Sequence, residues 1–417
     1  MNRNSLWAQA VSLGEEITAA RRHLHKYPEL GFEEVLTSAY LAEELSKLGL
    51  LVRTGVAGTG IIALLEGASP GPVIALRADM DALPLEEQTG LAFASVHEGR
   101  MHACGHDGHM AMLLGAAKLL AGLKGELAGT VKFIFQPAEE MLGGARHMIR
   151  AGALESPRVD AIIGLHLWPD FPTGQFGLKE GTIMASMDHV DITVHGRAGH
   201  GAAPHQAVDA IYAASQVLTA LQSLISRESD PADPVVLSMG SVHGGSLPNI
   251  IADRVEMKGT VRAVRRETRE YMAQRIPELA ESVARGLNAR AEVRYEFGYP
   301  PTVNDGELVR LAELTLEEGP GRSSVKRLAH SQMTSEDMAY YMERVPGAFV
   351  LVGTGGEGPG EFPLHHPRMM IDERSLTLGA AFLADYTVRL LREFQNKFSV
   401  TEEISASGTG DSMQHVE

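Results

Sequence analysis

Cysteine is nearly absent from this chain of 417 residues, which contains Cys104 and no other. A disulfide within the chain is therefore impossible, and a reducing compartment such as the cytoplasm is the simpler expectation. The sequence also lacks an uninterrupted apolar run of the ~18 to 20 residues that a membrane span needs. Residues 1–16 contain no apolar run long enough for a signal peptide. These absences predict a cytoplasmic protein with no membrane partner.

Lysine and arginine are outnumbered by acidic residues, 37 to 53, so the formal net charge is −16 with histidine neutral. Such a surface repels the phosphates of nucleic acids, and we expect no nucleic-acid partner. Glycine and proline stand at ordinary levels, with 44 and 20 residues, and nothing indicates a fibrous or low-complexity chain. The length indicates two or three domains of ~150 residues each.

The apolar pattern of the first part of the chain predicts an α/β domain. Amphipathic helices are expected over residues 6–24 and from Thr37 or Ser38 to residue 48, and a third carries Met110 to Leu120. Continuous apolar strands that alternate with helices are typical of a mostly parallel sheet covered on both faces. The expected strands of this sheet are residues 61–65, 73–76, 131–135 and 161–165.

The pattern changes after Ser186, where strands and helices follow in the order βαββαβ. This order predicts a ferredoxin-like α+β unit with one open sheet face. The first pattern returns near Gly298, with a strand over 349–352 and a helix over 376–394. We therefore predict a discontinuous α/β domain (1–187 and 298–397), an inserted α+β lid (188–297) and a disordered tail (398–417). The expected lid elements are strands 190–194, 235–242, 254–264 and 291–297 and helices 207–225 and 269–285.

The densest chemical feature is the segment Met101-His102-Ala103-Cys104-Gly105-His106-Asp107-Gly108-His109. Thiolate and imidazole are preferred ligands of zinc and its neighbours, and aspartate suits the role of orienting a ligand ring. This composition favours a metal site. The alternative is a polar turn before a helix, with histidines that are merely solvated.

Two adjacent carboxylates, Glu139 and Glu140, follow the expected strand 131–135. Open α/β sheets bind their ligands at the carboxyl ends of strands. One carboxylate of such a pair can bind a metal while its neighbour faces a bound water as a general base. The alternative is a pair that starts a helix, where the helix dipole favours acidic residues.

Further polar residues follow other expected strands. His166 comes after strand 161–165, Asp79 and Asp81 follow strand 73–76, and His365 lies in a loop after several glycines. Taken together, they predict one site at the carboxyl edge of the sheet. The glycine-rich lid loops 196–204 and 244–249 read as connectors, although a histidine or asparagine on a mobile loop could instead touch a substrate.

Three motifs resemble signatures of the M20 family of metallopeptidases, most closely its subfamily D. They are residues 101–109, Gln136-Pro137-Ala138-Glu139-Glu140 and Arg77-Ala78-Asp79-Met80-Asp81-Ala82-Leu83-Pro84, supported by residues 23–34 and 335–337. Subfamily D contains hippurate hydrolases, N-acyl-amino-acid deacylases and auxin-conjugate hydrolases. The resemblance, which spans about residues 6 to 394, implies a metal-dependent amidohydrolase that cleaves N-acyl or N-aroyl amino acids. Cleavage of small peptides, as by a dipeptidase or carboxypeptidase, is the alternative.

The resemblance also implies roles for single residues. Two divalent ions, zinc, manganese, cobalt or nickel, would be held by Cys104, His106, Glu140, His166 and His365. Glu139 matches the general base. His200 matches a lid histidine that steadies the oxyanion across a homodimer, and Asn249 a lid residue near the substrate carboxylate. Asp79 corresponds to an aspartate that orients a ligand histidine, while Arg77 stands where other branches keep that ligand.

Two rival interpretations remain open at the level of sequence. Cys104 could act as the nucleophile of a cysteine hydrolase with a histidine base. The site could also be degenerate and only bind a ligand without catalysis. The number of different ligand types around Cys104 argues against the first, and the intact Glu139 and Glu140 argue against the second.

Overall fold

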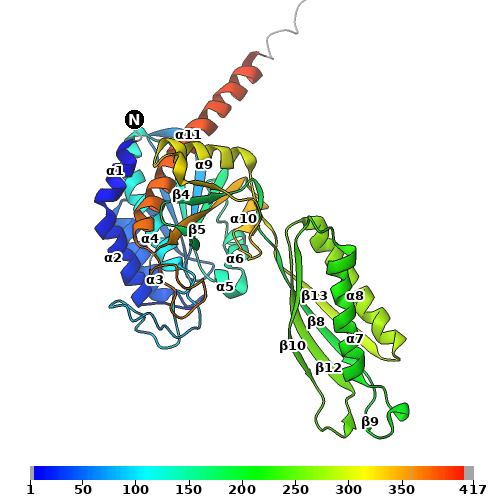
Figure 1. Cartoon of the computed structure of the whole chain (residues 1–417). Coiled ribbons are helices and arrows are strands. Elements are labelled where there is room, and N and C mark those ends of the chain that lie inside the picture. Colours follow the sequence, from blue (N-terminus) through cyan, green and yellow to red (C-terminus); the bar gives the residue numbers. More distant parts are fainter. Residues whose placement is uncertain (1–3, 357, 408–417) are drawn as a thin grey trace, which may run out of the picture. The chain divides into compact units, whose positions relative to one another are not determined.

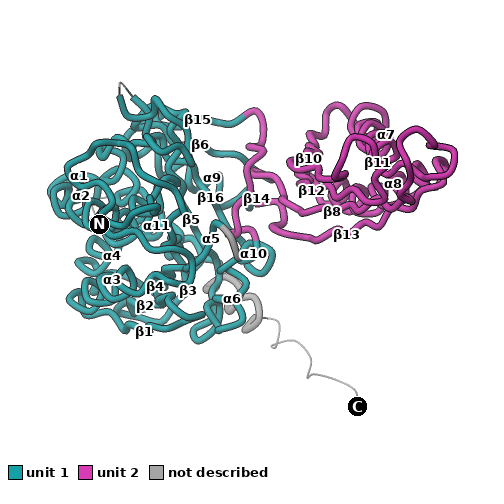
Figure 2. The backbone as a smooth tube through the Cα atoms, turned by 90° about the horizontal axis from the view of Figure 1, so that it is seen from below, with its two compact units in different colours: residues 1–181, 304–328, 340–417 teal, residues 182–303, 329–339 magenta. Residues whose placement is uncertain are grey.

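A computed structural model describes residues 4–356 and 358–407, and the chain divides into two compact units (Figures 1 and 2). Unit 1 comprises Met1–Gly181, Asn304–Leu328 and Tyr340–Glu417, and unit 2 comprises Thr182–Val303 and Ala329–Ala339. The expected lid, 188–297, did not include residues 329–339. Tertiary pairing places them in unit 2, because the Gln332 amide donates to Ile183 O (2.8 Å) and the Ala185 amide donates to Gln332 O (2.9 Å).

Within the described residues, unit 1 contains one eight-stranded sheet with a parallel centre. The central ladders β4–β3, β3–β5 and β5–β16 are parallel, whereas β1–β2, β2–β4 and β16–β6 are antiparallel. The strands, in spatial order, are β1 (Leu51–Val56), β2 (Gly60–Glu66), β4 (Ala128–Gln136), β3 (Ser69–Asp79), β5 (Ala161–Pro172), β16 (Gly347–Gly355), β6 (Phe176–Leu178) and β15 (Val325–Arg327).

Helices pack against this sheet, and α4 is the most deeply buried of its long helices. Nearly every residue of α4 is buried, because it packs on β3 and β5 and is covered by α2 and α11. Gly115 permits this close approach, since an added Cβ would lie 2.8 Å from Ile17 Cδ1 and 2.9 Å from Ala380 Cβ. The helices of this unit are α1 (Asn4–Ser12), α2 (Gly14–Lys26), α3 (Val35–Lys47), α4 (His106–Ala121), α5 (Glu139–Leu142), α6 (Gly144–Arg150), α9 (Gly306–Glu318), α10 (Ala339–Met342) and α11 (Arg374–Ser407), with the short turns η1 (Lys124–Glu126) and η4 (Arg322–Ser324).

Strand register brings three polar positions to one level of the sheet. Asp79 is paired with Gln136, and Arg77 is paired with both Ile134 and Gly164. Asp79 on β3, Gln136 on β4 and His166 on β5 each lie two residues beyond these paired positions, so they reach the same level of the sheet. The strand that carries His166 does not end there as expected, because β5 continues to Pro172.

Unit 2 is an antiparallel sheet with two helices on one face. Its chain order β8-α7-β10-β12-α8-β13 is the expected βαββαβ order, and the spatial order is β10-β12-β8-β13. Alternating residues Val190, Ile192 and Val194 are buried against α7 and α8. The elements are β8 (Met187–His195), β9 (Gly199–His200), η2 (Pro204–Gln206), α7 (Ala210–Ser223), η3 (Leu224–Glu228), β10 (Val235–Gly244), β11 (Ile250–Ile251), β12 (Arg254–Ala263), α8 (Arg266–Gly286) and β13 (Arg290–Tyr299), and the short strands β7 (Gly181–Met184) and β14 (Thr302–Asn304) pair with each other.

Several expected boundaries were wrong. The single helix over 6–24 is two helices, α1 and α2, separated at Leu13. Helix α3 begins at Val35 rather than after a Thr37 or Ser38 cap, because the Glu29 carboxylate accepts from the amides of Leu36 (3.1 Å) and Thr37 (2.8 Å). A side chain outside the helix thus satisfies its first amides.

The expected tail overlaps the last helix. Helix α11 runs to Ser407 and so includes residues 398–407. A helix nucleated by packed residues gains one hydrogen bond for each residue added, and little burial is needed to extend it. The rest of the expected tail, 408–417, lies outside the described residues.

Candidate metal centre

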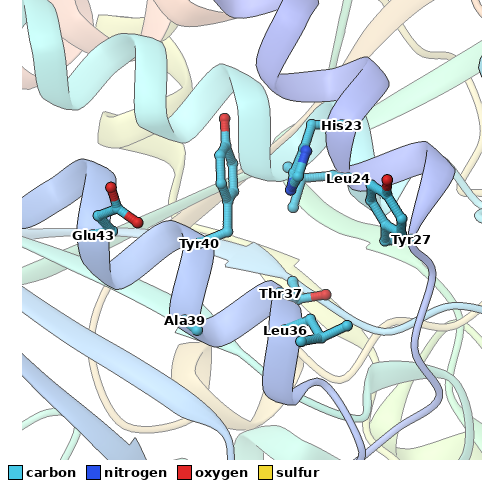
Figure 3. A pocket seen from close by; sticks show the side chains of 8 residues that line it. All are labelled: His23, Leu24, Tyr27, Leu36, Thr37, Ala39, Tyr40 and Glu43. Atoms are coloured by element: carbon cyan, nitrogen blue, oxygen red, sulfur yellow. The ribbon is translucent and has the colours of Figure 1, made fainter.

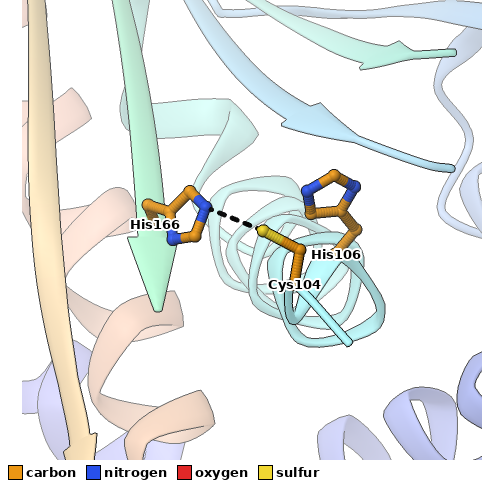
Figure 4. Close-up of side chains that lie close together, drawn as sticks. All are labelled: Cys104, His106 and His166. Atoms are coloured by element: carbon orange, nitrogen blue, oxygen red, sulfur yellow. Dashed lines mark hydrogen bonds between the residues drawn. The ribbon is translucent and has the colours of Figure 1, made fainter. Parts of the chain in front are cut away.

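The five side chains that the resemblance assigned to metal binding come together in unit 1. Cys104 Sγ lies 3.5 Å from His166 Nε2 and 3.3 Å from His365 Nε2. His365 Nε2 lies 3.2 Å from Glu140 Oε1, which lies 3.8 Å from His106 Nε2. The potential ligand atoms therefore form one continuous cluster, and Figure 4 shows Cys104, His106 and His166 within it.

Local backbone geometry positions these side chains. Gly105 has a φ of 87° and separates Cys104 from His106, the first residue of α4. Ala138 has a φ of 54° and turns the chain from β4 into α5. The amides of Glu139 and Glu140 then donate to the two carboxylate oxygens of Asp81, at 2.9 and 3.0 Å. Asp81 thus anchors the segment that presents both glutamates.

The structure distinguishes between His365 and its neighbour His366. The His365 amide donates to Ala103 O at 2.8 Å, which holds this residue beside Cys104. The ring of His366 stacks on Phe362 with centroids 4.4 Å apart, and its Nδ1 accepts from the Arg368 amide. His365 is therefore the histidine of this loop that reaches the cluster.

Buried polar atoms without partners test whether a metal fits this cluster. Nδ1 of His106 faces Asp81 Oδ1 at 3.4 Å. Nε2 of His106 and Oε1 of Glu140 are buried 3.8 Å apart, and among the described residues neither has a hydrogen-bond partner. Unpaired buried polar atoms are costly. A cation with nitrogen, oxygen and sulfur ligands would satisfy them, so the donor set fits a metal.

The charge around the cluster supports the same fit. Burial lowers the pKa of His106, but Asp79, Asp81 and Glu140 outweigh it and raise that pKa to about 10. Burial, together with the carboxylates of Glu140 and Glu139, holds the pKa of the Cys104 thiol well above its usual value. The site therefore carries excess negative charge that a bound cation would balance.

Asp79 contacts a histidine that lies outside the predicted ligand set. Its Oδ1 accepts from His109 Nδ1 at 2.6 Å and its Oδ2 accepts from Arg77 at 2.9 Å, whereas His106 Nε2 is 3.8 Å away. Burial raises the pKa of Asp79, but the charges of His106, His109 and Arg77 prevail and hold it well below the usual range. The carboxylate is thus ionised and orients His109, which is not among the predicted ligands.

Comparison with known proteins identifies the family. Residues 75–389 match the model of peptidase family M20/M25/M40. This chain belongs to that family. Its relatives are hydrolases, so the protein is a metal-dependent hydrolase, and the expected family and fold class are confirmed.

Three relatives of this M20 hydrolase cover nearly its whole length. The N-acetyl-L-cysteine deacetylase of Bacillus subtilis is 40% identical over 381 residues, which are 91% of this chain and 89% of the relative. Thermostable carboxypeptidase 1 of Saccharolobus solfataricus is 40% identical over 392 residues, 91% and 96% of the two chains. The solved structure of the Bacillus subtilis YxeP protein, described as a dinuclear metal binding peptidase from the M20 family, has a TM-score of 0.80 at 38% identity and covers 91% of this chain and 99% of its own.

A buried charge network behind α4 of the M20 hydrolase was not predicted as part of the site. Asp107 Oδ2 accepts from Arg21 Nε and His25 Nδ1, both at 2.7 Å, and His25 Nε2 lies 3.1 Å from Glu87 Oε1. Burial raises the pKa of Asp107, but Arg21 and His25 outweigh it and lower that pKa strongly. The network ties α2 to the start of α4. Its signals in the sequence were Asp107 in the segment 101–109 and His25 in the motif at residues 23–34.

The two predicted lid residues lie together in unit 2. His200 in β9 is paired with Ile250 in β11, and the Gly201 amide donates to Asn249 O at 2.8 Å. The Ala202 amide donates to His200 Nδ1 at 3.0 Å. Because an amide can only donate, the ring proton is assigned to Nε2, which can serve as a donor. The predicted roles of His200 and Asn249 toward a substrate stay predictions.

A pocket of about 370 Å³ lies between α2 and α3 of unit 1, apart from the predicted ligands (Figure 3). It is lined by His23, Leu24, Tyr27, Leu36, Thr37, Ala39, Tyr40 and Glu43. No predicted site residue lines it. Among the described residues, no helix is apolar and long enough to cross a membrane.

Proposed function

We propose that this M20 hydrolase cleaves the amide bond between an acyl or aroyl group and the nitrogen of an amino acid, releasing a carboxylic acid and the free amino acid. The observation that carries the proposal is the arrangement of Glu139 and Glu140. Ligand atoms of His106, Glu139 and Glu140 lie within 4.8 Å of one another, and Glu140 also faces His365. One carboxylate can therefore bind a metal while the other moves a proton.

Two divalent ions per chain fit the donors offered by Cys104, His106, Glu140, His166 and His365. This mixed set of sulfur, nitrogen and oxygen suits zinc and admits manganese, cobalt or nickel. When bound, the ions would polarise the substrate carbonyl and lower the pKa of a water molecule. The description of the YxeP protein as dinuclear supports the number of ions.

The side chains then carry out the proton transfers. A Glu139 carboxylate oxygen accepts a proton from the attacking water as the water oxygen bonds to the carbonyl carbon. Glu139 returns that proton to the amide nitrogen as the carbon–nitrogen bond breaks. His200, from the second subunit of a homodimer formed through the lid, donates from Nε2 to the oxyanion. Asn249 binds the carboxylate of the amino acid. The roles of His200 and Asn249 rest on the resemblance.

Carboxypeptidase or dipeptidase cleavage by the same site is the second candidate. The Saccharolobus solfataricus relative, named a carboxypeptidase, favours it. Both reactions break an amide next to a free carboxylate, so they differ in what precedes the amide and not in the metal centre.

Amine release from a panel of N-acyl amino acids and dipeptides tests the proposal. The protein is supplied with zinc or manganese, and a matched sample is treated with EDTA. Metal-dependent release from N-acetyl amino acids or hippurate is expected, with slower release from dipeptides. Release from dipeptides alone would favour the second candidate, and the absence of release from metal-loaded protein would overturn the proposal.

The same chelator comparison addresses a cysteine nucleophile. A nucleophilic cysteine needs its thiolate form, whereas burial and the neighbouring glutamates raise the pKa of Cys104. Turnover that survived complete metal removal would nevertheless favour the thiol mechanism.

A further inference from the structure

His109 is a buried histidine whose two ring nitrogens are both occupied. It lies on α4, one turn beyond His106, and is 2% exposed. Its Nδ1 is 2.6 Å from Asp79 Oδ1, and the Leu167 amide donates to its Nε2 at 2.9 Å. Because the amide can only donate, Nε2 is the acceptor and the proton is assigned to Nδ1. No lone pair is left for a metal, although the ring lies close to His106.

Leu167 connects His109 to a predicted ligand. The carbonyl of Leu167 accepts from His166 Nδ1 at 2.7 Å. The remaining nitrogen of that ring, Nε2, therefore carries a lone pair, and it lies 3.5 Å from Cys104 Sγ. The main chain of Leu167 is thus held on one side by His109 and holds His166 on the other.

Asp79 and its partners anchor the other end of this chain of contacts. Arg77 donates from Nη1 to Asp79 Oδ2 and from Nε to Gln136 Oε1, both at 2.9 Å. Arg77, Asp79, Gln136 and His109 are all nearly inaccessible to solvent. The contacts therefore join β4, β3, α4 and β5 at the level of the sheet where the predicted ligands gather.

We infer that His109 is a positioning residue, which fixes the orientation of the His166 ring through the main chain of Leu167. Asp79 selects the tautomer of His109, because an ionised carboxylate can only accept and so requires the proton on Nδ1. This inference rests on the proposed function, in which His166 binds a metal. Partners of ligand histidines commonly change metal affinity by 10- to 100-fold when they are replaced.

Three substitutions of His109 separate positioning from space filling. His109→Phe fills much of the volume but offers neither donor nor acceptor. His109→Asn can still donate to Asp79 but is too short to accept from the Leu167 amide. His109→Gln has the length to accept from that amide and also provides a donor. The matched control is His23→Phe, since His23 lies in the pocket between α2 and α3.

Cobalt(II) binding to the metal-free full-length variants provides the readout. Titration gives the dissociation constant, and the visible absorption bands of the bound ion report its coordination geometry. We expect His109→Phe and His109→Asn to raise the dissociation constant by ~10- to 100-fold and to alter the bands. His109→Gln should restore most of both properties, and His23→Phe should match the wild type.

Wild-type affinity and bands in both His109→Asn and His109→Phe would overturn the inference while leaving the proposed function intact. Should His109→Phe fail to fold, the comparison between His109→Asn and His109→Gln decides the question, because both keep a polar side chain. Equal cobalt binding by those two variants would overturn the inference. If the wild type itself bound no cobalt, both the inference and the proposed function would be contradicted.

Discussion

Glu139 and Glu140 are adjacent residues to which the proposed mechanism assigns different tasks. Both backbone amides are held by Asp81, so the two side chains start from a common anchor. Oε1 of Glu140 faces the rings of His365 and His106, whereas Glu139 is the proposed proton carrier. At the scale of the residue, this division predicts that equivalent substitutions at the two positions have different consequences.

Replacing Glu139 by Gln should reduce turnover by ~10²- to 10⁴-fold, because an amide cannot take up a proton from water. Metal content should not change. Glu140→Gln should instead weaken metal binding, and Glu66→Gln at the exposed end of β2 is the control. Turnover and metal content are measured on the same samples. Retained turnover in Glu139→Gln would exclude this residue as the general base.

Glu34 gives a pH prediction at the same scale. Its carboxylate accepts from the Ala138 amide at 2.9 Å, and burial raises its pKa to about 7. The folded chain therefore holds this proton more tightly than the unfolded chain. The resulting stability is fully present below the unfolded pKa of about 4.5 and is lost as pH rises through 7.

Between pH 5 and pH 8 the metal-free wild type should therefore lose ~1 to 3 kcal/mol more stability than Glu34→Gln, whose side chain does not titrate. Urea unfolding of both proteins at the two pH values measures the difference. The same loss in both proteins would show that Glu34 is not the group responsible.

At the scale of the element, predictions were accurate where a repeating apolar pattern coincided with burial. The strands β2, β4 and β5 and the helices α4 and α8 lie where periodicity placed them, although with different ends. The short strands β6 and β15 have too few residues to show an apolar pattern. They are defined by tertiary pairing, since β6 pairs with β16 and β15 pairs with β6. Helix α9 was missed despite a signal, since Asp305 caps it by accepting from the Leu308 amide at 3.0 Å.

One buried ion pair holds together three elements of unit 2. Asp188 on β8 is fully buried, and its carboxylate binds Arg269 of α8 at 2.7 to 3.1 Å. It also accepts from the hydroxyl of Tyr295 at 2.8 Å and from the Gly298 amide at 2.9 Å. Removing such a carboxylate leaves a buried charge and buried donors without partners.

Asp188→Ala should therefore lower the free energy of unfolding by ~3 to 5 kcal/mol. Asp191→Ala, at a half-buried position on the same strand, should change it by far less. Thermal and urea unfolding of the full chain compare the two variants. Equal effects would mean that the Asp188 network contributes little net stability.

At the scale of the whole molecule, the proposed homodimer predicts that each active site combines residues from two subunits. If His200 serves the site of the partner subunit, His200→Ala and Glu139→Gln each inactivate a homodimer. A mixed dimer regains one complete site, which combines Glu139 of one chain with His200 of the other. After dissociation and random reassociation, equal amounts should recover about a quarter of wild-type turnover. Mixtures no more active than their components would place His200 in the site of its own chain.

The sequence alone determined the family, the α/β and βαββαβ patterns and the residue types of the metal centre, because these are local signals of spacing and composition. It assigned the loop ligand to His365 only through the resemblance, and the loop geometry at Ala103 and Phe362 favours His365 over the adjacent His366. It also suggested that Asp79 orients a ligand, whereas strand register and the approach of α4 pair Asp79 with His109. Only tertiary structure decides such contacts, since they join residues from separate elements, and a sequence pattern does not encode the distance between two side chains.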